Sequence, residues 1–325
     1  MIQRFYTLAS NTFVETVRQP IYGVILITAA LLMVLNVSLA AFTLSDDDKL
    51  LLDLGLSTLL LTGLFLSAFS ATGVLSREIE NKTVLTVVSK PVGRPTFILG
   101  KYVGLLAALA VAYYVSFLVF VLAQRHGVLQ NTSDPWDAPV LTFGVGGVLL
   151  AFIMAGFCNY FYGVHFSTGA LAFVVPILTV AVLLTAKLDE EWEIIEFGSN
   201  LISGQIVIAG YLVFLVLMIV AAVALAASTR FGQLMTLIIC TVVLGLGIAS
   251  DYAFGQHQES SILAWTAYRA VPNVGPFWII DGLTSGEEGT EAPVSYVLWA
   301  TAYAVLVTVA ILNIGIIAFQ KREVG

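Results

Sequence analysis

The chain has 325 residues, of which 59% are hydrophobic and only 11% are charged, and its formal net charge is −7. Soluble domains average about 45–50% apolar and about 25% charged residues, so this composition excludes an ordinary soluble protein. We therefore expect an integral membrane protein whose surroundings are the lipid bilayer, and we expect no nucleic-acid partner.

Residues 1–20 precede the first long apolar run and have the pattern of a helix with one apolar face. Apolar side chains recur there at three- and four-residue spacings, with polar residues elsewhere around the helix. The apolar positions are Ile2, Phe5, Tyr6, Ala9, Phe13 and Val17. Pro20 ends this helix because proline lacks the backbone donor that a continuous helix needs. We expect residues 1–20 to be a cytoplasmic interfacial helix.

Eight apolar runs follow, and most are long enough to cross about 30 Å of hydrocarbon. Such runs must be helical, because a backbone group exposed to lipid cannot stay unpaired. The runs are Ile21–Thr43, Leu54–Leu75, Tyr102–Gln124, Val140–Gly163, Thr168–Ala186, Ile206–Ser228, Leu234–Ser250 and Tyr296–Phe319. The sequence thus predicts an all-α, polytopic protein with a transmembrane domain over residues 21–319 and a short tail over 320–325.

The distribution of basic residues predicts the orientation. An even number of crossings puts both termini on one side, and Lys and Arg are enriched in cytoplasmic loops. With cytoplasmic termini, four of the 14 basic residues fall outside, namely Lys49, Arg125, Lys187 and Arg269. The inner ones are Arg4, Arg18, Arg77, Lys82, Lys90, Arg94, Lys101, Arg230, Lys321 and Arg322. We therefore expect both termini to be cytoplasmic.

Acidic residues are distributed in the opposite way. All but four of the 21 acids lie in the predicted outer segments, which include Asp46–Asp48, Asp189–Glu191 and a long outer loop over 251–295. Such acids either keep the outer loops solvated or attract a cationic cargo or partner. The sequence leaves both interpretations open.

The apolar runs carry no Asp, Glu, Lys or Arg in their interiors. Ion-coupled carriers usually keep ionisable groups at membrane depth, so such a carrier is disfavoured, although neutral oxygens remain able to hold sodium. Cys158 and Cys240 lie inside apolar runs, and the three histidines are isolated, so we expect no metal site. No glycine-rich segment has the residue spacing of a phosphate-binding loop. We expect no enzyme activity and no cofactor in this chain.

The main predicted cytoplasmic loop, residues 76–101, carries half of the inner positive charge. Glu78 and Glu80 precede the apolar stretch Val84–Val88, and Lys90 and Pro91 follow it. Carboxylates near the start of a helix and a lysine near its end suit the helix dipole, so we expect a short amphipathic helix on the membrane surface. The valines leave a strand possible, and a loop that serves topology alone is a further alternative.

The sequence resembles the permease subunits of type-2 ATP-binding-cassette (ABC) exporters, in particular the bacterial class associated with multicopper-enzyme maturation. The loop pattern of that family corresponds to Glu78, Glu80, Thr83, Pro91, Arg94, Gly100 and Lys101. Arg18–Pro20 resembles the family's elbow, and Ala227–Arg230 its short inner turn. Val271–Asn273 with Phe277 and Asp281 resembles its outer loop, and Phe319–Val324 its closing tail.

The resemblance implies a permease in a bacterial cytoplasmic (inner) membrane, working as a homodimer or heterodimer with a similar chain. MgATP would bind to a separate cytosolic ATPase, and loop 76–101 would couple the two. The expected coupling residues are Glu78, Glu80, Thr83, Val84, Leu85, Lys90, Pro91, Arg94, Gly100 and Lys101. The sequence departs from the family at Lys82, where glycine is common, and in the added helical pair over 140–186. A scaffold that anchors an extracytoplasmic complex is the main alternative.

Overall fold

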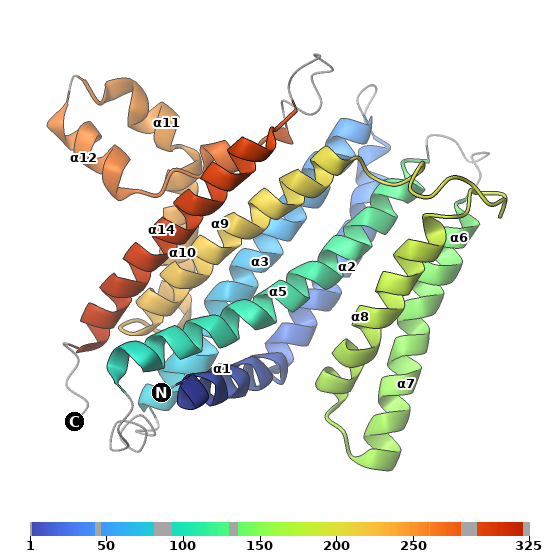
Figure 1. Ribbon diagram of the computed structural model, residues 1–325, viewed down its shortest axis with the longest axis horizontal. Coiled ribbons are helices and arrows are strands. Elements are labelled where there is room, and N and C mark those ends of the chain that lie inside the picture. The colour runs from blue at the N-terminus through green and yellow to red at the C-terminus, as the bar shows by residue number, and fades with distance from the viewer. Residues whose placement is uncertain are drawn as a thin grey trace. The chain divides into compact units, whose positions relative to one another are not determined.

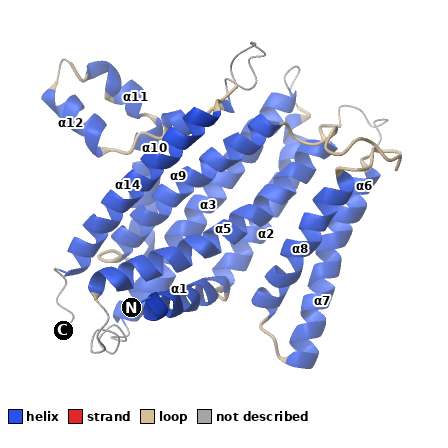
Figure 2. Cartoon of the chain, in the orientation of Figure 1, coloured by secondary structure: helices blue, strands red, loops and turns tan. Residues whose placement is uncertain are grey.

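The computed structural model describes residues 2–42, 47–80, 93–129, 136–259, 261–280 and 291–320, without the side chains of Ile2, residues 76–80 and Gln320. Within these ranges the chain is all-α, as predicted, and its one β feature is an isolated bridge between Leu188 and Ile194 (Figure 2).

Among the described residues, seven helices are long and apolar enough to cross a membrane, which indicates a multi-pass membrane protein. Each coincides with one of the predicted apolar runs. They are α2 (Pro20–Ala40), α3 (Asp47–Glu80), α5 (Arg94–His126), the continuous span 138–162, α8 (Phe166–Thr185), α9 (Gly204–Ser228) and α14 (Val294–Gln320). The span 138–162 consists of α6 (Ala138–Val140), the π-helix η1 (Leu141–Val145) and α7 (Gly146–Tyr162).

The remaining predicted crossing, Leu234–Ser250, does not continue as a single straight helix. α10 (Gln233–Ile248) has 16 residues, about 24 Å of helix, and the chain bends by 67° into α11 (Ser250–Ala253) and η2 (Gly255–His257). A contact with a later segment, residues 272–274, accompanies the bend. Gly247 lets the following loop approach closely, since a Cβ there would lie 2.7 Å from the carbonyl oxygen of Pro272, and the Val274 amide donates to the Gly247 carbonyl at 3.0 Å. Residues 233–257 thus form a broken span or a re-entrant loop.

The chain divides into two compact units, and α3, α5 and α9 each contribute residues to both. The first unit comprises residues 1–19, 63–109 and 211–325. Its central helix is α9, which is apolar on all sides, as expected for a buried helix. α9 packs against Gly63 of α3 through Leu217 and against Gly315 of α14 through Ala226, and Tyr102 of α5 donates to its Met218 carbonyl (Figure 1).

The second unit comprises residues 20–62 and 110–210. α7 and α8 form an antiparallel pair that packs on the second half of α5. Their shared core is aliphatic and consists of Val115, Leu118, Leu122, Val140, Ala151, Val174 and Leu178. In the same unit Asn36 of α2 donates to the Thr58 hydroxyl of α3 at 2.9 Å, so this buried amide has a partner within the bilayer span.

The predicted cytoplasmic loop is shorter than residues 76–101. α3 continues to Glu80 and α5 begins at Arg94, because the polar ends of both helices extend beyond their apolar runs. Glu78 and Glu80, which the sequence places just before a new surface helix, belong to the last turn of α3. The surface helix predicted around Val84–Val88 lies outside the described residues.

Candidate functional site

α1 (Ile2–Val17) docks on the first turns of α5, within the first unit (Figure 1). Two glycines one helical turn apart, Gly100 and Gly104, allow the close approach. A Cβ on Gly104 would lie 2.3 Å from the Ala9 carbonyl oxygen, and a Cβ on Gly100 would lie 2.7 Å from the Leu8 side chain. This spacing of small residues is the GxxxG arrangement that brings membrane helices together.

The buried face of α1 agrees with the predicted apolar face at Ala9 and Val17 and differs from it elsewhere. Ala9, Thr12 and Thr16 are buried, whereas Tyr6 is 72% exposed. Small side chains lie against α5 because the two backbones are close. The hydroxyls of Thr12 and Thr16 donate to the carbonyls of Leu8 and Thr12, at 2.9 and 2.8 Å, so burying them leaves no unpaired donor.

Lys101 forms an ion pair across this helix contact. Its side chain is only 2% exposed, and its Nζ lies 3.6 Å from Oε2 of Glu15, a side chain that is 43% exposed. The same ammonium lies 5.8 Å from the ring centroid of Phe97, within range of a cation–π contact. A buried lysine is rare without a partner, so Glu15 and Phe97 together account for its position.

The same end of the first unit gathers two further segments. Phe97 stacks on Phe319 of α14, with 5.6 Å between ring centroids. Arg230, in the turn between α9 and α10, donates from Nε and Nη2 to the Ala318 carbonyl at 3.1 and 2.7 Å. We call Glu15, Phe97, Lys101, Arg230 and Phe319 the basal cluster. It joins the start of α5 to α1, to the α9–α10 turn and to the end of α14.

The structure places some of the predicted coupling residues in helix contacts, and others lie outside the residues that it describes. Gly100 and Lys101 lie in α5 and contact α1, while Arg94 is the first residue of α5. Glu78 and Glu80 end α3, and their side chains are not described. The other predicted coupling positions lie outside the described residues, and they are Thr83, Val84, Leu85, Lys90 and Pro91.

Sequence reasoning missed two members of the basal cluster, Glu15 and Phe97, and it also missed the role of Gly104 beside them. One signal was available, because Gly100 and Gly104 bracket Lys101 in a GxxxG pattern at the start of an apolar run. The partner of Lys101 was not readable, since nothing in the local sequence links it to a residue 86 positions earlier.

A second feature of the first unit is a cavity of about 520 Å³ beside α12 (Ile262–Ala270) and the start of α14. Aromatic residues dominate its lining, including Tyr268, Phe277, Tyr296, Trp299 and Tyr303. Asp251 organises one side of this region: its Oδ1 accepts from the Tyr268 hydroxyl at 2.9 Å and from Asn273 Nδ2 at 2.7 Å. The hydrogen bond to Asp251, followed by partial desolvation, raises the pKa of Tyr268 above its ordinary value.

Among the described residues, no group of three or more His, Cys, Asp or Glu side chains is placed to hold a metal ion. Comparisons of the chain with known protein families, with curated proteins and with solved structures find no match.

Proposed function

We propose that this protein is the permease subunit of an ATP-driven exporter of the type-2 ABC class, paired with a similar chain and powered by a separate cytosolic ATPase. The direction of transport, which is export, is the part of this proposal that rests on the sequence resemblance alone. In this arrangement the segment between α3 and α5 docks on the ATPase, and the chain itself performs no hydrolysis.

The observation that supports the proposal best is the basal cluster. Three stretches that resemble family motifs, at the start of α5, at Arg230 and at Phe319, are far apart in the sequence but are linked by the contacts of this cluster. α1, which includes the elbow-like region before Pro20, is fixed to the same place through Gly104 and Glu15. Convergence of these segments is what a mechanical coupling site requires.

The geometry also fits transmission of force. α5 begins directly after the proposed docking segment and continues without interruption for 33 residues, so displacement of its first turn displaces the whole helix. Because the end of α14 packs against Phe97 in that first turn, and α1 packs against Gly100 and Gly104 in the next two turns, both would move with it. A stiff, contiguous set of contacts of this kind has the properties of a two-state element that an ATPase can bias.

The experiment is purification of the full chain in mild detergent from its native membrane, followed by a MgATP hydrolysis assay. We expect a nucleotide-binding chain to co-purify and the preparation to hydrolyse ATP. Glu80→Lys and Val84→Arg are expected to remove both the partner and the hydrolysis. Glu196→Lys makes the same charge change on an exposed residue of a predicted outer loop and serves as the matched control.

Two results would overturn the proposal: a stable, correctly inserted chain that binds no nucleotide-binding partner, or equal loss of ATP hydrolysis in Glu196→Lys and Glu80→Lys. The second candidate function, a scaffold for a complex on the outer side, is favoured by the aromatic cavity beside Trp299. It predicts crosslinks to other proteins from position 265 on α12 and none from position 84.

A further inference from the structure

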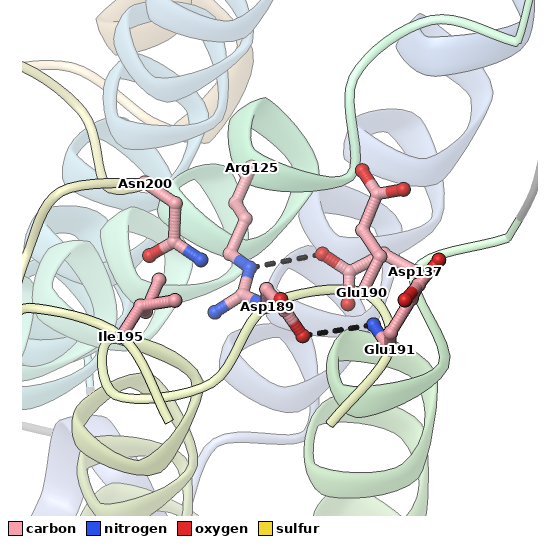
Figure 3. Close-up of a pocket in the computed structure, with 7 residues that line it drawn as sticks. All are labelled: Arg125, Asp137, Asp189, Glu190, Glu191, Ile195 and Asn200. Carbon is pink, nitrogen blue, oxygen red and sulfur yellow. Dashed lines mark hydrogen bonds and ion pairs between the residues drawn. The ribbon is translucent and has the colours of Figure 1, made fainter. Parts of the chain in front are cut away.

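The second unit contains a cavity of about 350 Å³ at the end of α5, lined by residues from three segments. Arg125 comes from the last turn of α5, Asp137 precedes α6, and the remaining residues come from the connection between α8 and α9. Figure 3 shows the lining, which consists of Arg125, Asp137, Asp189, Glu190, Glu191, Ile195 and Asn200. The volume is at the small end of the range of about 300–1,000 Å³ for ligand pockets.

Arg125 is held rigidly, yet one of its donors has no partner. Its Nε donates to Asp137 Oδ2 at 2.9 Å, and both side chains are only 2% exposed. Its Nη2 donates to the Leu188 carbonyl at 2.8 Å. Nη1 is buried and makes no hydrogen bond to any residue that the structure describes. Since unmade hydrogen bonds of buried charged groups are costly, this donor indicates a missing acceptor.

Asn200 provides the complementary observation on the same wall. Its Nδ2 donates to the Leu188 carbonyl at 2.8 Å, which fixes the amide, while its Oδ1 is buried and accepts no hydrogen bond from the described part of the chain. Arg125 and Asn200, which both line the cavity, thus contribute one unpaired donor and one unpaired acceptor among the described residues. A ligand that satisfies both carries a hydrogen-bond acceptor and an N–H or O–H donor.

The charge of the lining favours a cation. Arg125 is neutralised by Asp137, which leaves the carboxylates of Asp189, Glu190 and Glu191. Within the described ranges, no ion pair joins these three acids to a basic residue. A wall of three negative charges with one neutralised arginine attracts a positive ligand and repels an anion.

Two further contacts fix the walls. Asp189 Oδ1 accepts from the amides of Glu191 and Glu193 at 2.9 and 2.8 Å, so the acidic turn has a defined shape. Trp192 adopts φ 68°, a left-handed conformation that is unusual for a bulky residue, and its ring packs edge-on against Phe143 of the π-helix. The acidic turn is thereby tied to the 138–162 span.

We infer that this cavity binds an organic ammonium ion that also bears an oxygen acceptor, such as an amino alcohol. The ammonium would pair with the carboxylates of Glu190 and Glu191 and donate to Asn200 Oδ1, and the ligand oxygen would accept from Arg125 Nη1. A metal ion is a poor fit, because these acids are not placed as a metal-binding group. The inference does not rest on the proposed transport function.

The same chemistry occurs in free ethanolamine and in the headgroup of phosphatidylethanolamine. The test therefore begins with calorimetric titration of ethanolamine into the full chain in nanodiscs of phosphatidylcholine and phosphatidylglycerol. We expect saturable binding that weakens at least about tenfold, about 1.4 kcal/mol, in Glu190→Gln/Glu191→Gln. The matched control, Glu193→Gln/Glu196→Gln, removes equal charge from the same connection outside the lining and is expected to bind like the parent.

The lipid arm repeats the titration in nanodiscs that contain phosphatidylethanolamine. A raised apparent Kd for ethanolamine identifies the headgroup as the occupant, and an unchanged Kd identifies a soluble amine; both outcomes support the site. Absence of saturable binding, or equal weakening by the two double variants, would overturn it. Displacement of bound ethanolamine by Mg²⁺ alone, with the same sensitivity to Glu190 and Glu191, would also overturn it in favour of a metal site.

Discussion

The burial of Lys101 depends on its ion-pair partner, Glu15, and not on the residues next to it in the sequence. The sequence puts it at the end of a loop, because a charge next to an apolar run is normally the polar end of a span. The structure puts it in the second turn of α5, with 2% of its side chain exposed and Glu15 at 3.6 Å. Pairing across helices, supported by the ring of Phe97, is the reason that this charge can be buried.

The first prediction concerns this ion pair. Glu15→Gln leaves the Lys101 ammonium with less compensation, so we expect a loss of about 1 kcal/mol in stability, limited by the partial exposure of Glu15. In a Lys101→Met background, Glu15→Gln is expected to have little effect. The measurement is a double-mutant cycle of thermal unfolding in detergent. Equal losses in both backgrounds would show that the pair makes no contribution.

The second prediction concerns pH. The raised pKa of Tyr268 means that the folded state favours the neutral phenol, which donates to Asp251. This contribution to stability is complete below the ordinary tyrosine pKa of about 10 and is lost as the pH rises through the raised value. Subtracting the ultraviolet titration curve of Tyr268→Phe from that of the parent isolates the ionisation of Tyr268. We expect its midpoint to lie above the ordinary tyrosine pKa, and we expect Asp251→Asn to lower this midpoint. A midpoint at or below the ordinary pKa would refute the hydrogen bond.

At the level of elements, the apolar runs predicted the helices well and their ends poorly. Each of the eight runs coincides with a helix, because hydrophobic length dictates helical structure in lipid. The ends of α3 and α5 were missed, since their outer turns are polar and helical hydrogen bonding does not depend on apolar side chains. The bend after α10 was missed too, because it depends on a hydrogen bond from the Val274 amide to the Gly247 carbonyl. This bond joins segments that are distant in the sequence.

The third prediction concerns the docking of α1 on α5. Gly104→Leu is expected to cost at least about 3 kcal/mol, because a side chain there displaces the α1 backbone around Ala9. Gly146→Ala is the matched control, since a Cβ at Gly146 meets nothing within 4 Å, and the change is expected to be neutral or to stabilise the helix by up to about 1 kcal/mol. Thermal unfolding of both variants in detergent provides the comparison, and similar midpoints would contradict the close approach.

For the whole molecule, the number of crossings decides whether the two termini lie on the same side of the membrane. Eight crossings place both termini on one side, whereas a re-entrant 233–257 segment leaves seven and separates them. The charge distribution favours eight. The fourth prediction is that reporters fused to the N- and C-termini both report the cytoplasm, and that a cysteine at Ser199 is labelled by an impermeant reagent from outside. Termini on opposite sides would identify 233–257 as re-entrant.

Most of the architecture followed from hydrophobic length, but the sites did not. The basal cluster and the cavity at Arg125 are assembled from segments that meet only after the helices pack, so no local pattern shows them. The acids of Asp189–Glu191 were noticed as a group, yet their relation to Arg125 and Asn200 depends on tertiary contacts. The function rests on a resemblance in motif order, to which the basal cluster adds spatial proximity.

The central claim is that the segment between α3 and α5 contacts an ATPase, and photo-crosslinking from position 84 in intact membranes tests it most directly. A photoreactive amino acid at Val84 is expected to crosslink to one nucleotide-binding polypeptide, with a yield that changes when MgATP is added. The same probe at position 265 is expected to give no such product. Crosslinks from position 84 to lipid or to this chain alone, insensitive to MgATP, would contradict the proposed coupling.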